Sequence, residues 1–142
     1  MKPTRIQRED HMEIHYADKV VFVGYREDVL ELVSVCDVFA LPSLWEGMPY
    51  ALLEAMLLAR PVVTTTVCSE VVADCETGLV VPPADDAALA AAVARLLNRP
   101  DEAVRMGLAG RERLRTLFSA DRMAAETLEV YERVLSRRGG AR

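Results

Sequence analysis

The sequence predicts an α/β fold with a mainly parallel sheet, helices on both faces of it and further helices toward the C-terminus. Short apolar runs rich in β-branched residues alternate with segments of helical period, and from about residue 85 onward only the helical period remains. Strands that alternate with helices are typical of βαβ units, whose parallel sheet is covered on both faces. The 142 residues, 51% of them hydrophobic, suffice for one domain with one core.

Four segments are predicted to be buried strands, because each is short and apolar and ends at a glycine, a proline or a polar stretch. They span residues 20–24, 37–42, 61–65 and 78–83. Apolar residues recur with helical spacing in five other segments, which span 26–36, 49–59, 87–97, 101–117 and 119–136. The connection 66–77 is expected to be irregular, with one helical turn around 70–74. These elements place one domain at 20–136, between a polar arm at 1–19 and a frayed tail at 137–142.

Polar residues mark the starts of the C-terminal helices. Asp85 or Asp86 is expected to cap the helix that follows, because its carboxylate can accept a hydrogen bond from a first-turn N–H group. Asp101 and Ser119 are expected to cap the next two helices in the same way.

The helix expected at 101–117 carries two glycines and several arginines. Gly107 and Gly110 predict a weak spot in it, because glycine is a poor helix former. Its arginines alternate with Glu112 and apolar residues, which predicts a solvated face. These arginines are Arg105, Arg111, Arg113 and Arg115.

Composition and charge argue against several classes of function. The net charge of -5 argues against a general nucleic-acid binder, which carries a basic face. No secretory signal and no run of ~18 uninterrupted apolar residues occurs, so a cytoplasmic protein without a membrane span is expected. His11 and His15 have helical spacing but no further ligands around them, so no metal site is expected. An odd number of cysteines favours free thiols that fill space, and they are Cys36, Cys68 and Cys75.

Two glutamates carry the main functional signal. Glu46 lies in the loop after the second predicted strand, and Glu54 lies about one and a half turns inside the helix that Pro49 opens. Parallel sheets bind ligands at the carboxyl ends of their strands. Between the glutamates, Gly47 and Met48 present backbone N–H groups near a helix start, where an anion is favoured, and Gly47 has no Cβ in the way. A ligand with phosphate and sugar hydroxyls, such as a nucleotide sugar, suits this arrangement.

The same residues also have a purely structural interpretation. Glu46 could merely complement the helix dipole, and Glu54 could lie on a solvated face, because two glutamates at this spacing are common in helical proteins. Trp45 could stack on a base or a sugar, or it could cover the core. The loops at 42–48 and 64–69 are the two candidate ligand loops, because each follows a predicted strand.

The two glutamates belong to a longer string of sequence blocks. It begins with FVGYREDV at 22–29, has its most specific block, CDVFALPSLWEGMPYALLEAM, at 36–56, and continues with ARPVVTT at 59–65 and ETGLVVPP at 76–83. This string resembles the nucleotide-sugar-binding domain of family-4 glycosyltransferases, which have the GT-B fold, and the whole resemblance covers about residues 20–135.

The resemblance implies a role for each matching residue. Glu46 and Glu54 match the ends of the family's E-x7-E motif, in which the first glutamate faces the donor sugar at the catalytic centre and the second holds the ribose hydroxyls. Gly47 and Met48 match the backbone that lies against the donor sugar and the diphosphate. The family is retaining and generally independent of metals, so no cofactor is expected, and amides and basic side chains offset the diphosphate charge. Further candidate site residues are Ser43, Trp45, Pro49 and Glu70.

Three features depart from the family's pattern. The arm at 1–19 lacks the G-x-x-x-x-K/R-G stretch that supplies a basic side chain to the diphosphate, and its only basic candidates are Lys2, Arg5, Arg8 and Lys19. The acceptor domain of a GT-B enzyme has no counterpart here. The loop at 66–70 is shorter than the family's Gly-Gly-x-Pro-Glu run and lacks its glycines, although Glu70 matches its glutamate.

Two hypotheses follow. On the first, the chain is the donor-binding part of a retaining glycosyltransferase that acts on an unknown acceptor, and it is a fragment, one half of a split enzyme with a separate N-terminal domain, or the product of a truncated gene. On the second, it is a catalytically incompetent remnant that serves as a nucleotide-binding or interaction module. In either case an uncovered sheet edge predicts self-association.

Overall fold

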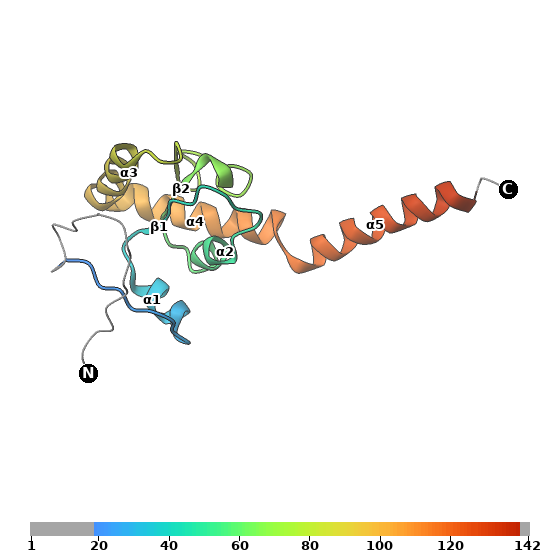
Figure 1. Cartoon of the computed structure of the whole chain (residues 1–142), viewed down its shortest axis with the longest axis horizontal. Helices are drawn as coiled ribbons and strands as arrows, with labels where there is room; N and C mark the ends of the chain where they lie inside the picture. Colours follow the sequence, from blue (N-terminus) through green and yellow to red (C-terminus); the bar gives the residue numbers. More distant parts are fainter. Residues whose placement is uncertain (1–18, 140–142) are drawn as a thin grey trace, which may run out of the picture.

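The described part of the chain, residues 19–139 of the computed structural model, consists of a small sheet, the helices around it and a long last helix (Figure 1). The strands are β1 (Phe39–Leu41), β2 (Val62–Thr65) and β3 (Leu79–Val81). The helices are α1 (Val29–Val35), α2 (Tyr50–Leu57), α3 (Asp86–Asn98), α4 (Pro100–Leu117) and α5 (Ala120–Gly139), and a short 3-10 helix, η1, spans Thr66–Cys68. The predicted α/β fold with C-terminal helices is confirmed. The predicted arm up to residue 18 and the last three residues of the predicted tail lie outside the described residues.

The sheet is parallel throughout, with the strand order β1-β2-β3. Leu41 of β1 pairs with Thr64 of β2, and Thr65 of β2 pairs with Val81 of β3. Because all three strands run in one direction, their carboxyl ends lie at the same edge. The loop after β1, at 42–49, and η1 after β2 therefore start side by side.

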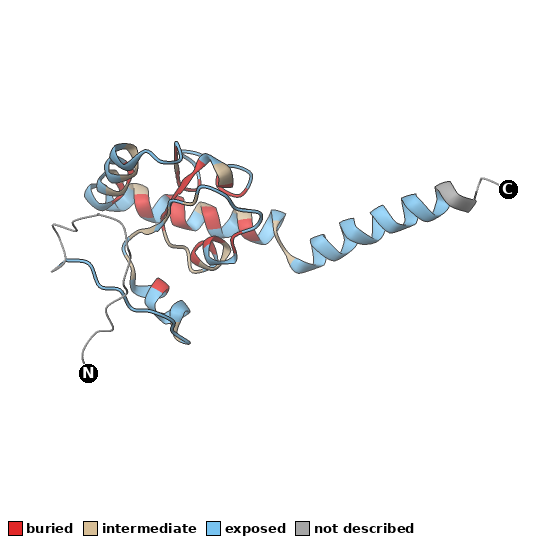
Figure 2. Cartoon of the chain, in the orientation of Figure 1, coloured by how far each residue is buried: buried red, intermediate tan, exposed pale blue. Residues whose placement is uncertain are grey.

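The core consists of two clusters of buried side chains, one on each face of the sheet. Val62 and Val63 are neighbours in β2 and belong to different clusters, as the alternation of side chains along a strand requires. The first cluster joins β2 to α1 and α2, and the second joins β2 and β3 to α3. Helix α4 supplies Leu114 to the first cluster and Met106 to the second, which is why its buried turns show as red bands in Figure 2.

The starts of the C-terminal helices are partly as predicted. The carboxylate of Asp85 accepts a hydrogen bond from the N–H of Ala88 at 2.8 Å, and the Ser119 hydroxyl accepts one from the N–H of Arg122 at 3.3 Å. The prediction for Asp101 is wrong. A proline at the first position already fixes the start of α4, so Asp101 lies in the first turn, where its charge complements the helix dipole.

The weak spot predicted in α4 is also wrong, because the helix runs without a break through both glycines. Gly107 and Gly110 are buried. A Cβ on Gly107 would clash with the backbone carbonyl of Ala59, which follows α2. Glycine is therefore required here for the close approach of two segments of the chain.

The predicted strand at 20–24 is absent, which corrects the sequence interpretation. Its apolar side chains are exposed, with Val21 at 80% and Phe22 at 74%. A strand needs a neighbouring backbone to pair with, and none of the described residues provides one beside this segment.

The helical turn predicted at 70–74 is also wrong, because the turn lies earlier, in η1, and Asp74 instead accepts a hydrogen bond from the N–H of Val80 at 2.9 Å.

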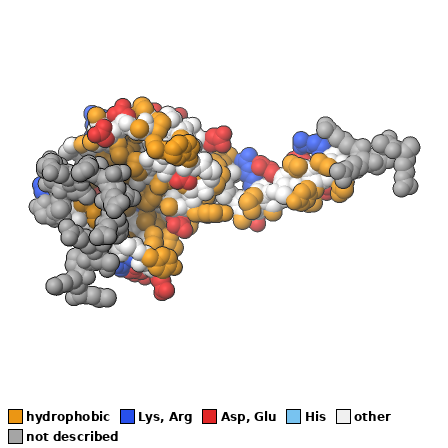
Figure 3. Space-filling view, viewed as in Figure 1, with side chains coloured by type: hydrophobic (Ala, Val, Ile, Leu, Met, Phe, Trp, Pro, Cys, Tyr) orange, Lys and Arg blue, Asp and Glu red, His pale blue; other side chains and the backbone are white. Residues whose placement is uncertain are grey.

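Helix α5 projects away from the rest of the described structure and is exposed from residue 120 to residue 136 (Figures 1 and 2). Apolar side chains lie along it in the space-filling view (Figure 3), and the exposed ones include Met123, Leu128, Tyr131 and Val134. Two ion pairs, Arg122–Glu126 and Glu129–Arg133, each join residues about one turn apart and stabilise the helix on its polar side. No helix in the described part of the chain is long and apolar enough to cross a membrane.

Candidate functional site

Two buried threonines of β2 fix the loop that follows β1. The Thr64 hydroxyl donates a hydrogen bond to the carbonyl of Leu41 at 3.1 Å, and the Thr65 hydroxyl donates one to the carbonyl of Ser43 at 2.6 Å. Both threonines are essentially inaccessible to solvent. The sequence indicated only that they are β-branched strand residues. The structure adds that their hydroxyls hold the first residues of the candidate ligand loop.

The same loop orients Glu46 through Ser43. The Ser43 hydroxyl donates a hydrogen bond to the Glu46 carboxylate at 2.8 Å, so Ser43 links this exposed carboxylate to the buried Thr65. Trp45, beside Glu46, is 83% exposed, so the interpretation that it covers the core is wrong. The exposed Glu46 carboxylate thus has a hydrogen-bond partner within its own loop.

The start of α2 has no side-chain cap. Pro49 occupies the N-cap position, immediately before the helix rather than in its first turn, and its side chain cannot accept a hydrogen bond. The first N–H groups of a helix lack partners within it, and the helix dipole makes this end positive. A Cβ on Gly47 would meet no atom within 4 Å, so the backbone beside the helix start is open to a ligand. The chemistry available here is the binding of an anionic group.

Glu54 lies inside α2 on the side away from the core. Leu52, Ala55 and Met56 are fully buried and anchor the opposite face of the helix in the first cluster. Glu54 is half-buried and shares its face with Tyr50, which is 77% exposed. Glu46 therefore lies in the loop before the start of α2, and Glu54 lies within the helix.

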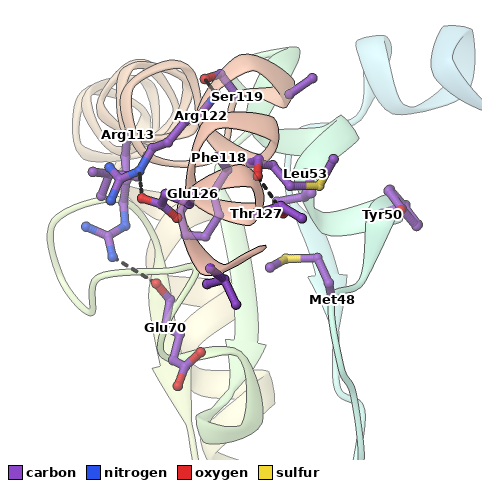
Figure 4. A pocket seen from close by; sticks show the side chains of 14 residues that line it. Met48, Tyr50, Leu53, Glu70, Arg113, Phe118, Ser119, Arg122, Glu126 and Thr127 are labelled. Carbon is purple, nitrogen blue, oxygen red and sulfur yellow. Dashed lines mark hydrogen bonds and ion pairs between the residues drawn. The ribbon is translucent and has the colours of Figure 1, made fainter. Parts of the chain in front are cut away.

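A hollow of about 780 Å³ lies between α2, the loop at Glu70 and the junction of α4 with α5 (Figure 4). Leu53 lines it from α2, Met48 lines it from the loop before α2, and Met123 lines it from α5. Of the predicted site residues, the structure brings Met48 and Glu70 together in this hollow. The others do not line it, and they are Ser43, Trp45, Glu46, Gly47, Pro49 and Glu54.

Arg113 is a residue at this hollow that the sequence interpretation missed. Its guanidinium donates to the backbone carbonyl of Val71 at 2.8 Å and to that of Glu70 at 2.9 Å (Figure 4 shows the second). A solvated face is therefore wrong for Arg113, whereas Arg111 and Arg115 are exposed as predicted. No spacing pattern signals these contacts, because the partners lie 42 and 43 residues away.

The three cysteines differ in burial and none is in a disulfide. Cys68 is buried, as a space-filling residue would be, and burial raises the pKa of the half-buried Cys36 thiol. Cys75 is exposed, and its side chain lies beside Arg95.

We therefore expect a thiol reagent to modify Cys75 first in the folded chain. The thiolate is the reactive form, and a raised pKa lowers its fraction at Cys36 at neutral pH. Mass spectrometry of peptides after brief exposure to iodoacetamide measures the order. Faster modification of Cys68 or Cys36 than of Cys75 would contradict this burial pattern.

No group of three His, Cys, Asp or Glu side chains that could hold a metal ion occurs within residues 19–139. His11 and His15, whose spacing the sequence raised, lie outside the described residues, as do three basic candidates of the arm, Lys2, Arg5 and Arg8.

Comparison with known proteins identifies the family. The profile described as "Glycosyl transferases group 1" matches residues 2–99. The chain belongs to this family. Among the curated proteins similar to this glycosyltransferase chain, alpha-maltose-1-phosphate synthase of Mycolicibacterium smegmatis is 42% identical over 114 residues, which cover 75% of this chain and 30% of that protein. The chain thus spans about a third or less of such relatives.

Solved glycosyltransferase structures share the fold. Sucrose-phosphate synthase from Thermosynechococcus elongatus superposes with a TM-score of 0.75 at 34% identity, covering 85% of this chain and 31% of that one. Anabaena Alr3699/HepE in complex with UDP-glucose superposes with a TM-score of 0.72 at 23% identity, covering 80% of this chain and 33% of that one. The Rossmann-like GT-B fold implied by the sequence resemblance is confirmed.

Proposed function

We propose that this chain is the donor-binding part of a retaining glycosyltransferase, which binds a nucleotide sugar at the start of α2. One observation carries the proposal. The start of α2 is uncapped, a hydrogen-bonded carboxylate, that of Glu46, precedes it, and a second carboxylate, that of Glu54, follows within the helix. This arrangement offers a positive helix end to a diphosphate and oxygen acceptors to sugar hydroxyls.

Each site residue has a defined task in the proposed reaction. Glu46 faces the donor sugar, and Glu54 accepts hydrogen bonds from the ribose hydroxyls. As the bond between the sugar and the diphosphate breaks, negative charge grows on the leaving nucleoside diphosphate, and the N–H groups of Gly47 and Met48 stabilise it. The helix dipole of α2 adds to this stabilisation, so the proposal requires no metal ion. Neither glutamate acts as a simple general base.

Calorimetric titration of the chain with UDP-glucose, GDP-mannose and ADP-glucose tests the proposal. UDP-glucose is the first probe because a neighbour with the same fold was solved with it. We expect saturable binding of at least one nucleotide sugar with one site per chain, and weaker binding of the free sugar, which lacks the diphosphate. Absence of saturable binding of all three at millimolar concentration would overturn the proposal.

Transfer of the sugar is tested separately, because it requires a bound acceptor as well as a bound donor. We expect the chain by itself to bind a donor without transferring its sugar. Radiolabelled donor offered with a mixture of sugar acceptors measures this. Transfer by the purified chain would show that the donor-binding part is sufficient for the reaction.

Self-association of the chain remains a prediction. Exposed apolar side chains at both ends of the described structure, such as Phe22 and Tyr131, support it, because contiguous apolar surface attracts a partner. In sedimentation equilibrium we expect an average mass above the 15.7 kDa of one chain, rising with concentration. A strictly monomeric chain at all concentrations would contradict the prediction.

A further inference from the structure

The guanidinium of Arg113 holds two consecutive carbonyls of the loop after η1. One arm of the fork, Nε, donates to Val71, and another, Nη2, donates to Glu70. A planar fork that engages two neighbouring acceptors fixes the orientation of both peptide groups, which a single point contact does not. Arg113 therefore defines the backbone course at Glu70.

The loop is anchored on its other side by the core. Val71 and Val72 are buried, at 3% and 1% exposure, and the N–H groups of both donate to the carbonyl of Cys68 at 3.0 Å. Glu70 precedes these anchors and is exposed. Ser69 and Glu70 are both exposed, and Arg113 holds the carbonyl of Glu70.

Arg113 is itself held in place. Its Cζ atom lies 5.9 Å from the centre of the Phe118 ring, at the end of the same helix. Glu70 and Arg113 line the same hollow as Met48, the residue before Pro49 at the start of α2. Through the loop at Glu70, α4 therefore reaches the hollow that Met48 lines from the loop before α2 (Figure 4).

We propose that Arg113 is a positioning residue, which holds the Glu70 loop in the form that binds the donor. The inference rests on the proposed function, and it adds Glu70 to the donor site, because Glu70 is a candidate site residue by its sequence position and lines the hollow together with Met48. Arg113 acts through backbone geometry and not by its charge alone.

Three variants of the full chain test this. Arg113→Met removes the donors but keeps an apolar stem against Phe118. Arg113→Lys keeps the charge but not the fork. Arg111→Met is the matched control, because Arg111 is exposed on the same helix. The readouts are amide hydrogen exchange of the peptide 66–72 and the Kd for UDP-glucose, with circular dichroism to confirm that each variant folds.

For both Arg113 variants we expect faster exchange in 66–72 and a Kd for UDP-glucose raised about tenfold, the size of effect that the loss of a hydrogen bond to a charged group produces. Arg111→Met should match the wild type in both readouts. If the wild type binds UDP-glucose and either Arg113→Met or Arg113→Lys binds it with the same Kd, this inference alone is overturned. Absence of saturable wild-type binding overturns the proposed function and this inference together.

Discussion

Replacing Gly107 by alanine is expected to lower the stability of the chain by roughly 2 kcal/mol. The new Cβ would clash with the carbonyl oxygen of Ala59 and would lie 2.8 Å from its carbonyl carbon. Overpacking of this kind costs up to about 3 kcal/mol, and the higher helix propensity of alanine returns only about 1 kcal/mol. The midpoint of thermal unfolding, followed by circular dichroism, should fall by about 6 °C.

The backbone at Ala59 has little freedom to move away from the new methyl group. Ala59 has a φ of 53° at the end of α2, and its N–H donates to the carbonyl of Met56 at 2.9 Å. The next N–H, that of Arg60, donates to the carbonyl of Ala55, also at 2.9 Å. Relief of the clash therefore requires α2 and α4 to separate, which would open the first core cluster.

Gly110→Ala is the matched control, one turn further along α4. Its new Cβ would lie 3.2 Å from the carbonyl oxygen of Thr77 and otherwise no closer than 3.7 Å to the flexible Met56 side chain. A small local shift relieves these contacts, so the gain in helix propensity offsets the cost and the stability should change by less than about 1 kcal/mol. Equal destabilisation by the two substitutions would show that Gly107 has no special role in the close approach.

The sequence predicts most of the fold because the fold follows from local patterns. The apolar run at 61–65 becomes β2, with Val62 and Val63 on opposite faces, and Asp85 caps α3 as its position before an apolar helix suggests. Such features depend on nearest neighbours along the chain. They survive in the structure wherever a partner element is present to pack against.

The predictions fail where a feature depends on distant parts of the chain. The segment at 20–24 has the composition of a strand, but composition cannot show whether a second backbone lies beside it. The glycines of α4 look like weak points in a single helix and become contact points only when α2 is placed against them. Arg113 falls in a periodic pattern of charges, and its carbonyl partners are visible only in three dimensions.

The candidate site likewise has features that a local sequence pattern predicts and features that depend on distant parts of the chain. The order of Glu46, Gly47, Pro49 and Glu54 is a sequence pattern, and it locates the start of α2 correctly to within one residue. The hydrogen bonds that hold the loop before it come from Thr64 and Thr65, on another strand. A motif can therefore nominate groups for contact with a ligand, while the residues that fix their positions have to be found in the structure.

Replacing Glu54 by alanine is expected to reduce the affinity for a nucleotide sugar by roughly 10- to 100-fold, given that a hydrogen bond to a charged group contributes about 1.5–3 kcal/mol. In the proposed site the Glu54 carboxylate accepts the ribose hydroxyls, and no other carboxylate lies within α2 to replace it. The Kd for UDP-glucose from calorimetry measures the loss. Because alanine is a strong helix former and Glu54 lies on the side of α2 away from the core, the fold should be retained.

Two further variants make the result specific. Glu54→Gln keeps the size of the side chain but loses its charge, so it should bind more weakly than the wild type and more tightly than Glu54→Ala. Glu76→Ala removes an exposed carboxylate from the turn before β3, at the opposite edge of the sheet from the proposed site, and should leave the Kd unchanged. If Glu54→Ala binds UDP-glucose as tightly as the wild type does, the ribose is held elsewhere, and the start of α2 loses its assigned partner.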